Sequence, residues 1–161
     1  MSATGLDVFD RTLQTTHTWL NEISERVGPD RLVAWHVLGA VIRALRDRQP
    51  LDLAAHFGAE LPLLVRGTYY DQWRPAGQPE KYRTLDEFLH TIGRNLGAIR
   101  PVDPRDAARA VFAVLSRHMN EGQIQKVRKA MPEDVRALWL EAEGTGAGMG
   151  SAESGPAESR A

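Results

Sequence analysis

Apolar residues recur at three- and four-residue intervals along most of this chain, and glycine or proline repeatedly interrupts the pattern. Such spacing places apolar side chains on one face of an α-helix, whereas a half-buried strand would alternate. Because glycine and proline end helices, each interruption separates two of them. The pattern predicts about eight helices, at residues 6–27, 31–48, 51–57, 62–74, 85–96, 104–119, 124–131 and 132–142. The expected fold is an all-α helical bundle.

The second predicted helix, 31–48, is apolar on nearly every side. A helix of this kind is covered by neighbours on several sides, so we expect it at the centre of the bundle. Asp30 is positioned to cap it, because its carboxylate can accept from free N–H groups of the first turn. Thr84 and Asp103 are expected to cap the fifth and sixth helices, with Glu87 completing a capping box beside Thr84.

The two halves of the chain resemble each other. A shift of 70 residues pairs Pro62 with Pro132 and Arg66 with Arg136, without a gap, among matched apolar positions. This repetition predicts two tandem duplicated units of three to four helices each, packed with pseudo-twofold symmetry. The final segment is rich in Gly, Ser and Ala and has no periodicity, so we expect it to be disordered. The predicted parts are an N-terminal arm at 1–5, a first unit at 6–74, a linker at 75–83, a second unit at 84–142 and a disordered tail at 143–161.

The segment 59–75, which closes the first unit, combines aromatic residues with arginines. This composition is enriched at protein-interface hot spots, and arginines at the end of the second helix would lie nearby if the two helices pack antiparallel. The predicted binding surface consists of Arg43, Arg46, Arg66, Tyr70, Trp73 and Arg74. In the alternative interpretation, the aromatic side chains belong to the core and the arginines pair with nearby acids.

Within this segment, the fourth helix has a face formed by Leu61, Leu64, Val65 and Tyr69, together with Thr68 and Trp73. Gly67 interrupts the helix at a cost of about 1 kcal/mol relative to alanine. That cost predicts that another element packs closely against the helix backbone at Gly67. Pro75 and Gly77 are expected to end the helix.

Composition excludes several classes of chemistry. The 161 residues include no cysteine, which excludes disulfides and thiolate metal sites. The net charge is −1, which makes nucleic acid an unlikely partner. No apolar run approaches the roughly 20 residues of a membrane span, and no signal-peptide pattern opens the chain, so a cytoplasmic protein is expected. The five histidines are scattered, and we assign no catalytic, cofactor-binding or metal-binding residue.

Three segments of the chain resemble a bacterial family of uncharacterised proteins catalogued as DUF2267. They are Ala-Val-Ile-Arg-Ala-Leu-Arg-Asp-Arg at 40–48, Gly-Ala-Glu-Leu-Pro-Leu-Leu-Val-Arg-Gly-Thr-Tyr-Tyr-Asp-Gln-Trp at 58–73 and Pro-Glu-Asp-Val-Arg-Ala-Leu-Trp at 132–139. Gln49 and Gln72 depart from the family pattern, where leucine and glycine are expected. The resemblance implies a small, helical, duplicated protein whose gene lies near stress-response genes. It implies no particular activity or cofactor.

These features favour a non-catalytic protein-interaction module, which binds another protein or itself. The first alternative is a small anionic-ligand-binding protein, or an enzyme, that uses a cleft between the two units. The second alternative is a DNA-binding helical protein. The sequence leaves the partner, the ligand and the oligomeric state open.

Overall fold

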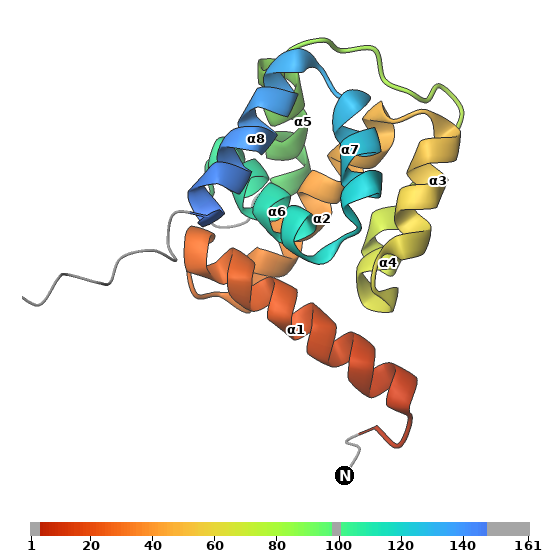
Figure 1. Ribbon diagram of the computed structural model, residues 1–161, viewed down its shortest axis with the longest axis vertical. Helices are drawn as coiled ribbons and strands as arrows, with labels where there is room; N and C mark the ends of the chain where they lie inside the picture. The colour runs from red at the N-terminus through yellow and green to blue at the C-terminus, as the bar shows by residue number, and fades with distance from the viewer. Residues whose placement is uncertain (1–3, 98–100, 148–161) are drawn as a thin grey trace, which may run out of the picture.

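The computed structural model describes residues 4–97 and 101–147, and all regular structure in these ranges is helical (Figure 1). The all-α prediction is confirmed there, with eight helices and no strand. Residues 1–3 of the predicted arm and 148–161 of the predicted tail lie outside the described ranges. The helices are α1 (Asp7–Val27), α2 (Arg31–Arg48), α3 (Leu51–Glu60), α4 (Leu63–Tyr70), α5 (Leu85–Leu96), α6 (Pro104–His118), α7 (Glu121–Lys129) and α8 (Glu133–Ala147).

Helix α2 lies at the centre of the bundle, as its apolar sequence predicts. It packs against α1, α4, α5 and α6, and every residue from Val37 to Ile42 is buried. Asp30 caps its N-terminus, because the carboxylate accepts from the Leu32 N–H at 2.9 Å. Because most of its residues are buried, α2 fixes the positions of its four neighbours.

The caps predicted for α5 and α6 are also present. The Thr84 hydroxyl oxygen accepts from the Glu87 N–H at 3.2 Å, and the Asp103 carboxylate accepts from the Arg105 N–H at 2.7 Å. The Glu87 carboxylate accepts from the Thr84 hydroxyl at 3.0 Å, whereas a full capping box would direct it to the backbone N–H of Thr84.

A stack of aromatic rings joins α5, α6 and α8. Phe112 lies in the middle, with ring centroids 6.1 Å from Phe88 and 4.2 Å from Trp139. All three rings are fully buried. The Trp139 indole N–H donates to the Ser116 hydroxyl at 2.7 Å, so its donor is satisfied inside the core.

The two predicted units pack into one body. Helix α1 contacts α6, and α2 contacts both α5 and α6. The buried Gln49 side chain of the first half donates to the Val127 carbonyl of the second at 3.3 Å. Tyr69 and Trp139, which the 70-residue shift pairs, are both fully buried. The duplication itself stays a prediction.

Two predicted helix ends in the first half are wrong. Helix α3 continues through Gly58 to Glu60. Helix α4 ends at Tyr70 rather than at Pro75. The chain leaves α4 at Asp71, whose ψ of 132° is extended, and Gln72 follows with a left-handed φ of 57°.

The predicted end of the last helix is also wrong. Helix α8 continues to Ala147, over the start of the predicted tail at 143–161. The Glu143 carboxylate accepts from the Arg128 guanidinium and from the Ser116 hydroxyl at 2.7 Å. These bonds tie the glycine-rich extension to α7 and α6, which compensates for its low helix propensity.

The expectation for Gly67 is wrong, and a different glycine makes the close contact. A Cβ atom placed on Gly67 would have no neighbouring atom within 4 Å. A Cβ placed on Gly58 would lie 2.7 Å from ring carbons of both Tyr69 and Tyr70. The absence of a side chain at Gly58 therefore allows α3 to pack against these rings, and the Tyr69 hydroxyl donates to the Ala54 carbonyl at 2.6 Å.

Two alanine substitutions test this packing. Gly67→Ala adds helix propensity without a clash, so we expect the free energy of unfolding to rise by about 0.5–1 kcal/mol. Gly58→Ala forces the tyrosine rings to move, so we expect a loss of about 1–3 kcal/mol. Urea unfolding followed by circular dichroism measures both. A stabilising Gly58→Ala would contradict the close packing of α3 on α4.

Candidate functional site

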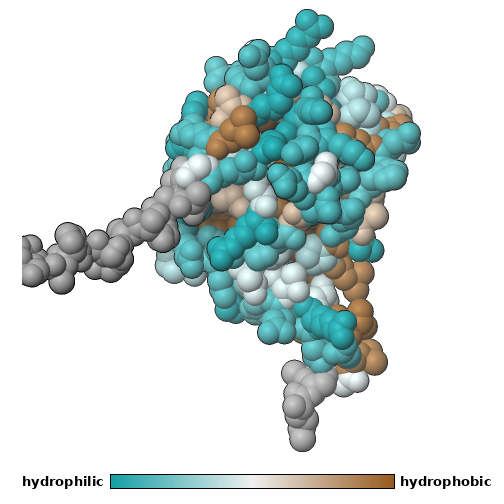
Figure 2. Space-filling model, viewed as in Figure 1, coloured by the Kyte–Doolittle hydropathy of each residue, from teal (hydrophilic) through white to brown (hydrophobic). Residues whose placement is uncertain are grey.

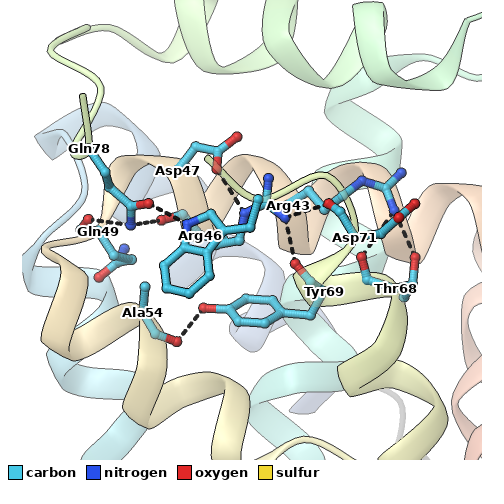
Figure 3. Close-up of polar contacts among 10 residues, drawn as sticks. Arg43, Arg46, Asp47, Gln49, Ala54, Thr68, Tyr69, Asp71 and Gln78 are labelled. Atoms are coloured by element: carbon cyan, nitrogen blue, oxygen red, sulfur yellow. Dashed lines mark hydrogen bonds and ion pairs between the residues drawn. The ribbon is translucent and has the colours of Figure 1, made fainter. Parts of the chain in front are cut away.

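Two arginines of α2 cap the C-terminal end of α4 (Figure 3). Arg43 Nη1 donates to the Thr68 hydroxyl at 2.7 Å and to the Thr68 carbonyl at 3.3 Å. Arg46 Nη1 donates to the carbonyls of Tyr69 at 2.6 Å and Asp71 at 2.9 Å. The last carbonyls of a helix have no partner within it, and positive charge at that end is favourable. These arginines therefore hold α4 against α2.

Burial sets the electrostatics of this cluster. Arg46 is buried, and its Nε donates to the Asp47 carboxylate at 2.8 Å. Burial and the neighbouring Arg46 lower the pKa of Arg43. Burial raises the pKa of Tyr69, which keeps its hydroxyl neutral and able to donate. The polar groups of the cluster therefore form hydrogen bonds with one another.

The linker satisfies the C-terminal end of α2 in turn (Figure 3). Gln78 Nε2 donates to the Arg46 carbonyl at 2.7 Å and to the Gln49 carbonyl at 2.8 Å. The Glu80 N–H donates to the Asp47 carbonyl at 2.8 Å. Because these carbonyls lie at the end of a central helix, they accept hydrogen bonds from Gln78 and Glu80 instead of from water.

Two further predicted site residues bind the junction between α3 and α4. Arg66 Nη2 donates to the carbonyls of Ala59 and Leu61, both at 3.0 Å. The Tyr70 hydroxyl donates to the Ala55 carbonyl at 3.3 Å. Both side chains are partly exposed; Arg66 engages carbonyls at the end of α3, and Tyr70 engages one in its middle.

The predicted surface is therefore largely occupied by its own chain. The Trp73 indole donates to Gln78 Oε1 at 2.5 Å, while Arg74 is exposed. Internal hydrogen bonds thus account for five of the six residues. The alternative interpretation paired the arginines with acids, but they donate mainly to backbone carbonyls, and Arg46 also pairs with Asp47. A partner site on this surface stays a prediction.

Sequence reasoning missed the structural roles of two glutamines. Gln49 is buried, and its Nε2 reaches the Val127 carbonyl at 3.3 Å and Met131 Sδ at 3.1 Å. Its departure from the expected leucine was the available signal, because a polar residue at an apolar position needs a buried partner. Gln78 gave no such signal, because a glutamine is ordinary in a linker.

An open cleft of about 590 Å³ lies between α1 and the helices α6, α7 and α8. Its charged lining has both signs: Arg26, Arg117, Arg128, Glu22, Glu25, Glu121 and Glu143. Glu22 contacts Arg117 at 3.3 Å and His118 at 2.8 Å, and Arg128 pairs with Glu143. No tyrosine lines it. The predicted anion-binding cleft would need several positive groups free of acidic partners, and two of its three arginines are paired with glutamates.

A different surface of the protein exposes large apolar side chains. Of the nine large apolar residues that are exposed within the described ranges, six lie at the N-terminal ends of α1 and α4. We call them the α1–α4 apolar surface: Leu6, Val8, Phe9, Leu13, Leu63 and Leu64. The two helices are joined here, because the Leu64 N–H donates to the Thr12 hydroxyl at 3.2 Å.

This surface follows the edge of the molecule where α1 projects past the other helices, and Figure 2 shows hydrophobic atoms along that edge. Leu64 is 40% exposed, although the helical spacing places it on one face with Leu61 and Val65, which are both buried. Leu64 lies in the first turn of α4, where the helix leaves the core and meets α1.

Neither a metal site nor a membrane-spanning helix is found among the described residues. Within residues 4–97 and 101–147, no group of three or more histidine, cysteine, aspartate or glutamate side chains is arranged to hold a metal ion. In the same ranges, no helix combines the length and apolar character needed to cross a membrane.

The fold and these surfaces define a small all-α protein with a buried central helix and an uncovered apolar strip. The family model described as "Uncharacterized conserved protein (DUF2267)" matches residues 16–138 of this chain. The chain belongs to the DUF2267 family, which confirms the resemblance seen in the sequence. No curated protein matches it.

The capping role of Arg46 can be measured against an exposed arginine of the same segment. We expect Arg46→Met to lower the free energy of unfolding by about 2–4 kcal/mol, because it leaves the buried carbonyls at the end of α4 without donors. Arg74→Met should change it by less than about 0.5 kcal/mol. Chemical denaturation of both variants measures these free energies of unfolding. Similar losses of stability in the two variants would contradict the capping role.

Proposed function

We propose that this protein is a non-catalytic protein-interaction module that binds its partner through the α1–α4 apolar surface. The observation that carries the proposal is the clustering of exposed large apolar residues at one place. Six side chains, each about half exposed, present on the order of 500 Å² of mostly apolar surface. Patches of this size on a folded monomer often mark binding sites.

The internal arrangement supports this proposal by holding the surface rigid. Arg43 and Arg46 hold the C-terminal end of α4, and Thr12 binds its N-terminal end to α1. The two helices that carry the surface are therefore fixed before a partner arrives. Preorganisation reduces the entropy lost on binding, which strengthens association for a given contact area.

The two alternatives have weaker support. A small anionic ligand in the cleft beside α1 would compete with the ion pairs formed by Glu22 and Glu143. DNA binding would need a surface dominated by arginine or lysine, yet Arg43, Arg46 and Arg66 are engaged with backbone carbonyls. An uncovered apolar strip fits a protein partner better than either ligand.

Site-specific photo-crosslinking in the cells that express the protein tests the proposal. Benzoylphenylalanine replaces Leu13 in one variant and Leu140 in a control. Leu140 is the more exposed of the two, 55% against 39%, and lies away from the surface on α8. We expect discrete protein adducts from position 13 and few from position 140, because only the former lies in a binding site.

Mass spectrometry of the adducts identifies the protein bound. If position 140 formed adducts as readily as position 13, exposure alone would explain the crosslinks and the proposal would fail. Circular dichroism of both purified variants checks that the helical fold is intact.

A further inference from the structure

We infer that the occupant of the α1–α4 apolar surface is a second copy of this chain, packed against the same surface across a twofold axis. The inference rests on the proposed function and adds the identity of the partner. It is carried by the apolar stripe on α1, the area of the surface and the charge around it.

The apolar stripe of α1 has the spacing of a helix-pairing seam. Its members alternate at intervals of three and four residues along the whole helix: Leu6, Phe9, Leu13, Thr16, Leu20, Ile23 and Val27. Sustained 3–4 spacing is the pattern by which one helix packs its side chains between those of another. A helix is therefore the complement that fits this stripe.

The protein itself covers only half of that seam. Thr16, Leu20 and Ile23 are buried against the bundle, whereas Leu6, Phe9 and Leu13 are exposed. The exposed half belongs to the end of α1 that projects past the other helices (Figure 1). Because Leu6, Phe9 and Leu13 stay exposed there beside α4, the same helix of a second copy can lie along them.

The area of the surface suits a dimer. A standard interface buries about 800 Å² on each partner, of which somewhat more than half is apolar. The roughly 500 Å² presented here supplies that apolar share. A twofold contact is also self-complementary, since each copy offers the seam that the other needs, and twofold dimers are the commonest protein assemblies.

The charges beside the seam do not select an oppositely charged partner. Residues 6–13 contain two aspartates and one arginine, Asp7, Asp10 and Arg11, which gives a net charge of −1. Asp7 pairs with Arg11 at 2.9 Å, and Asp10 accepts from the Thr4 hydroxyl at 2.8 Å. Repulsion between two copies is therefore weak, and a strongly basic or acidic partner gains little.

Sedimentation equilibrium over a range of concentrations tests the inference. We expect the wild-type chain to move from the monomer mass towards twice that mass as concentration rises into the micromolar range. The variant Phe9→Asp/Leu13→Asp should weaken self-association by roughly 100-fold or more, because it places charges inside the apolar contact. The matched control Leu140→Asp changes a more exposed leucine elsewhere and should associate like wild type.

Each outcome decides the inference. A wild-type chain that remains monomeric at hundreds of micromolar overturns it, whatever the variants do. A dimer that persists in the folded Phe9→Asp/Leu13→Asp variant also overturns it, because the contact then lies elsewhere. If the wild type is monomeric but benzoylphenylalanine at Leu13 crosslinks a different protein, the second copy is excluded while the proposed interaction function stands.

Discussion

The C-terminal end of α2 is the point on which the rest of this structure depends. Most residues of helix α2 are buried, and its last carbonyls take their partners from the protein. Gln78 and Glu80 supply them, which ties the linker to the core. From the same turn, Arg46 extends to the last carbonyls of α4. The C-terminal end of α2 thus fixes the positions of both the linker and α4.

The sequence predicts the elements well because their signals are local. The 3–4 spacing identified the helices, and the caps at Asp30, Thr84 and Asp103 lie where the residue types indicated. The errors at Gly58 and in the last helix have a tertiary cause. Gly58 lies inside a helix because its small size lets tyrosine rings pack there. The glycine-rich end of α8 stays helical because Glu143 is held by Arg128 from α7.

The candidate site was harder to predict because arginine and tyrosine are common both in binding surfaces and in contacts that hold helices together. Arginine and tyrosine are enriched in interface hot spots, and they also donate to orphan carbonyls at helix ends. Their spacing along the chain is the same in both cases. What decides between them is the position of α4 relative to α2, since Arg43 and Arg46 reach the end of α4 only when these helices pack together. That relation is tertiary, and local sequence does not encode it.

The stripe on α1 presents the converse problem. Its apolar residues have the same spacing from Leu6 to Val27, so the sequence gives one continuous signal for a buried face. The helix has 21 residues and is about 31 Å long, and its buried residues begin only at Thr12. Where coverage stops depends on the dimensions of the other helices rather than on α1 itself. The apolar residues whose spacing predicts a buried face are therefore partly the ones that stay exposed, while the polar residues that resemble an interface complete the fold.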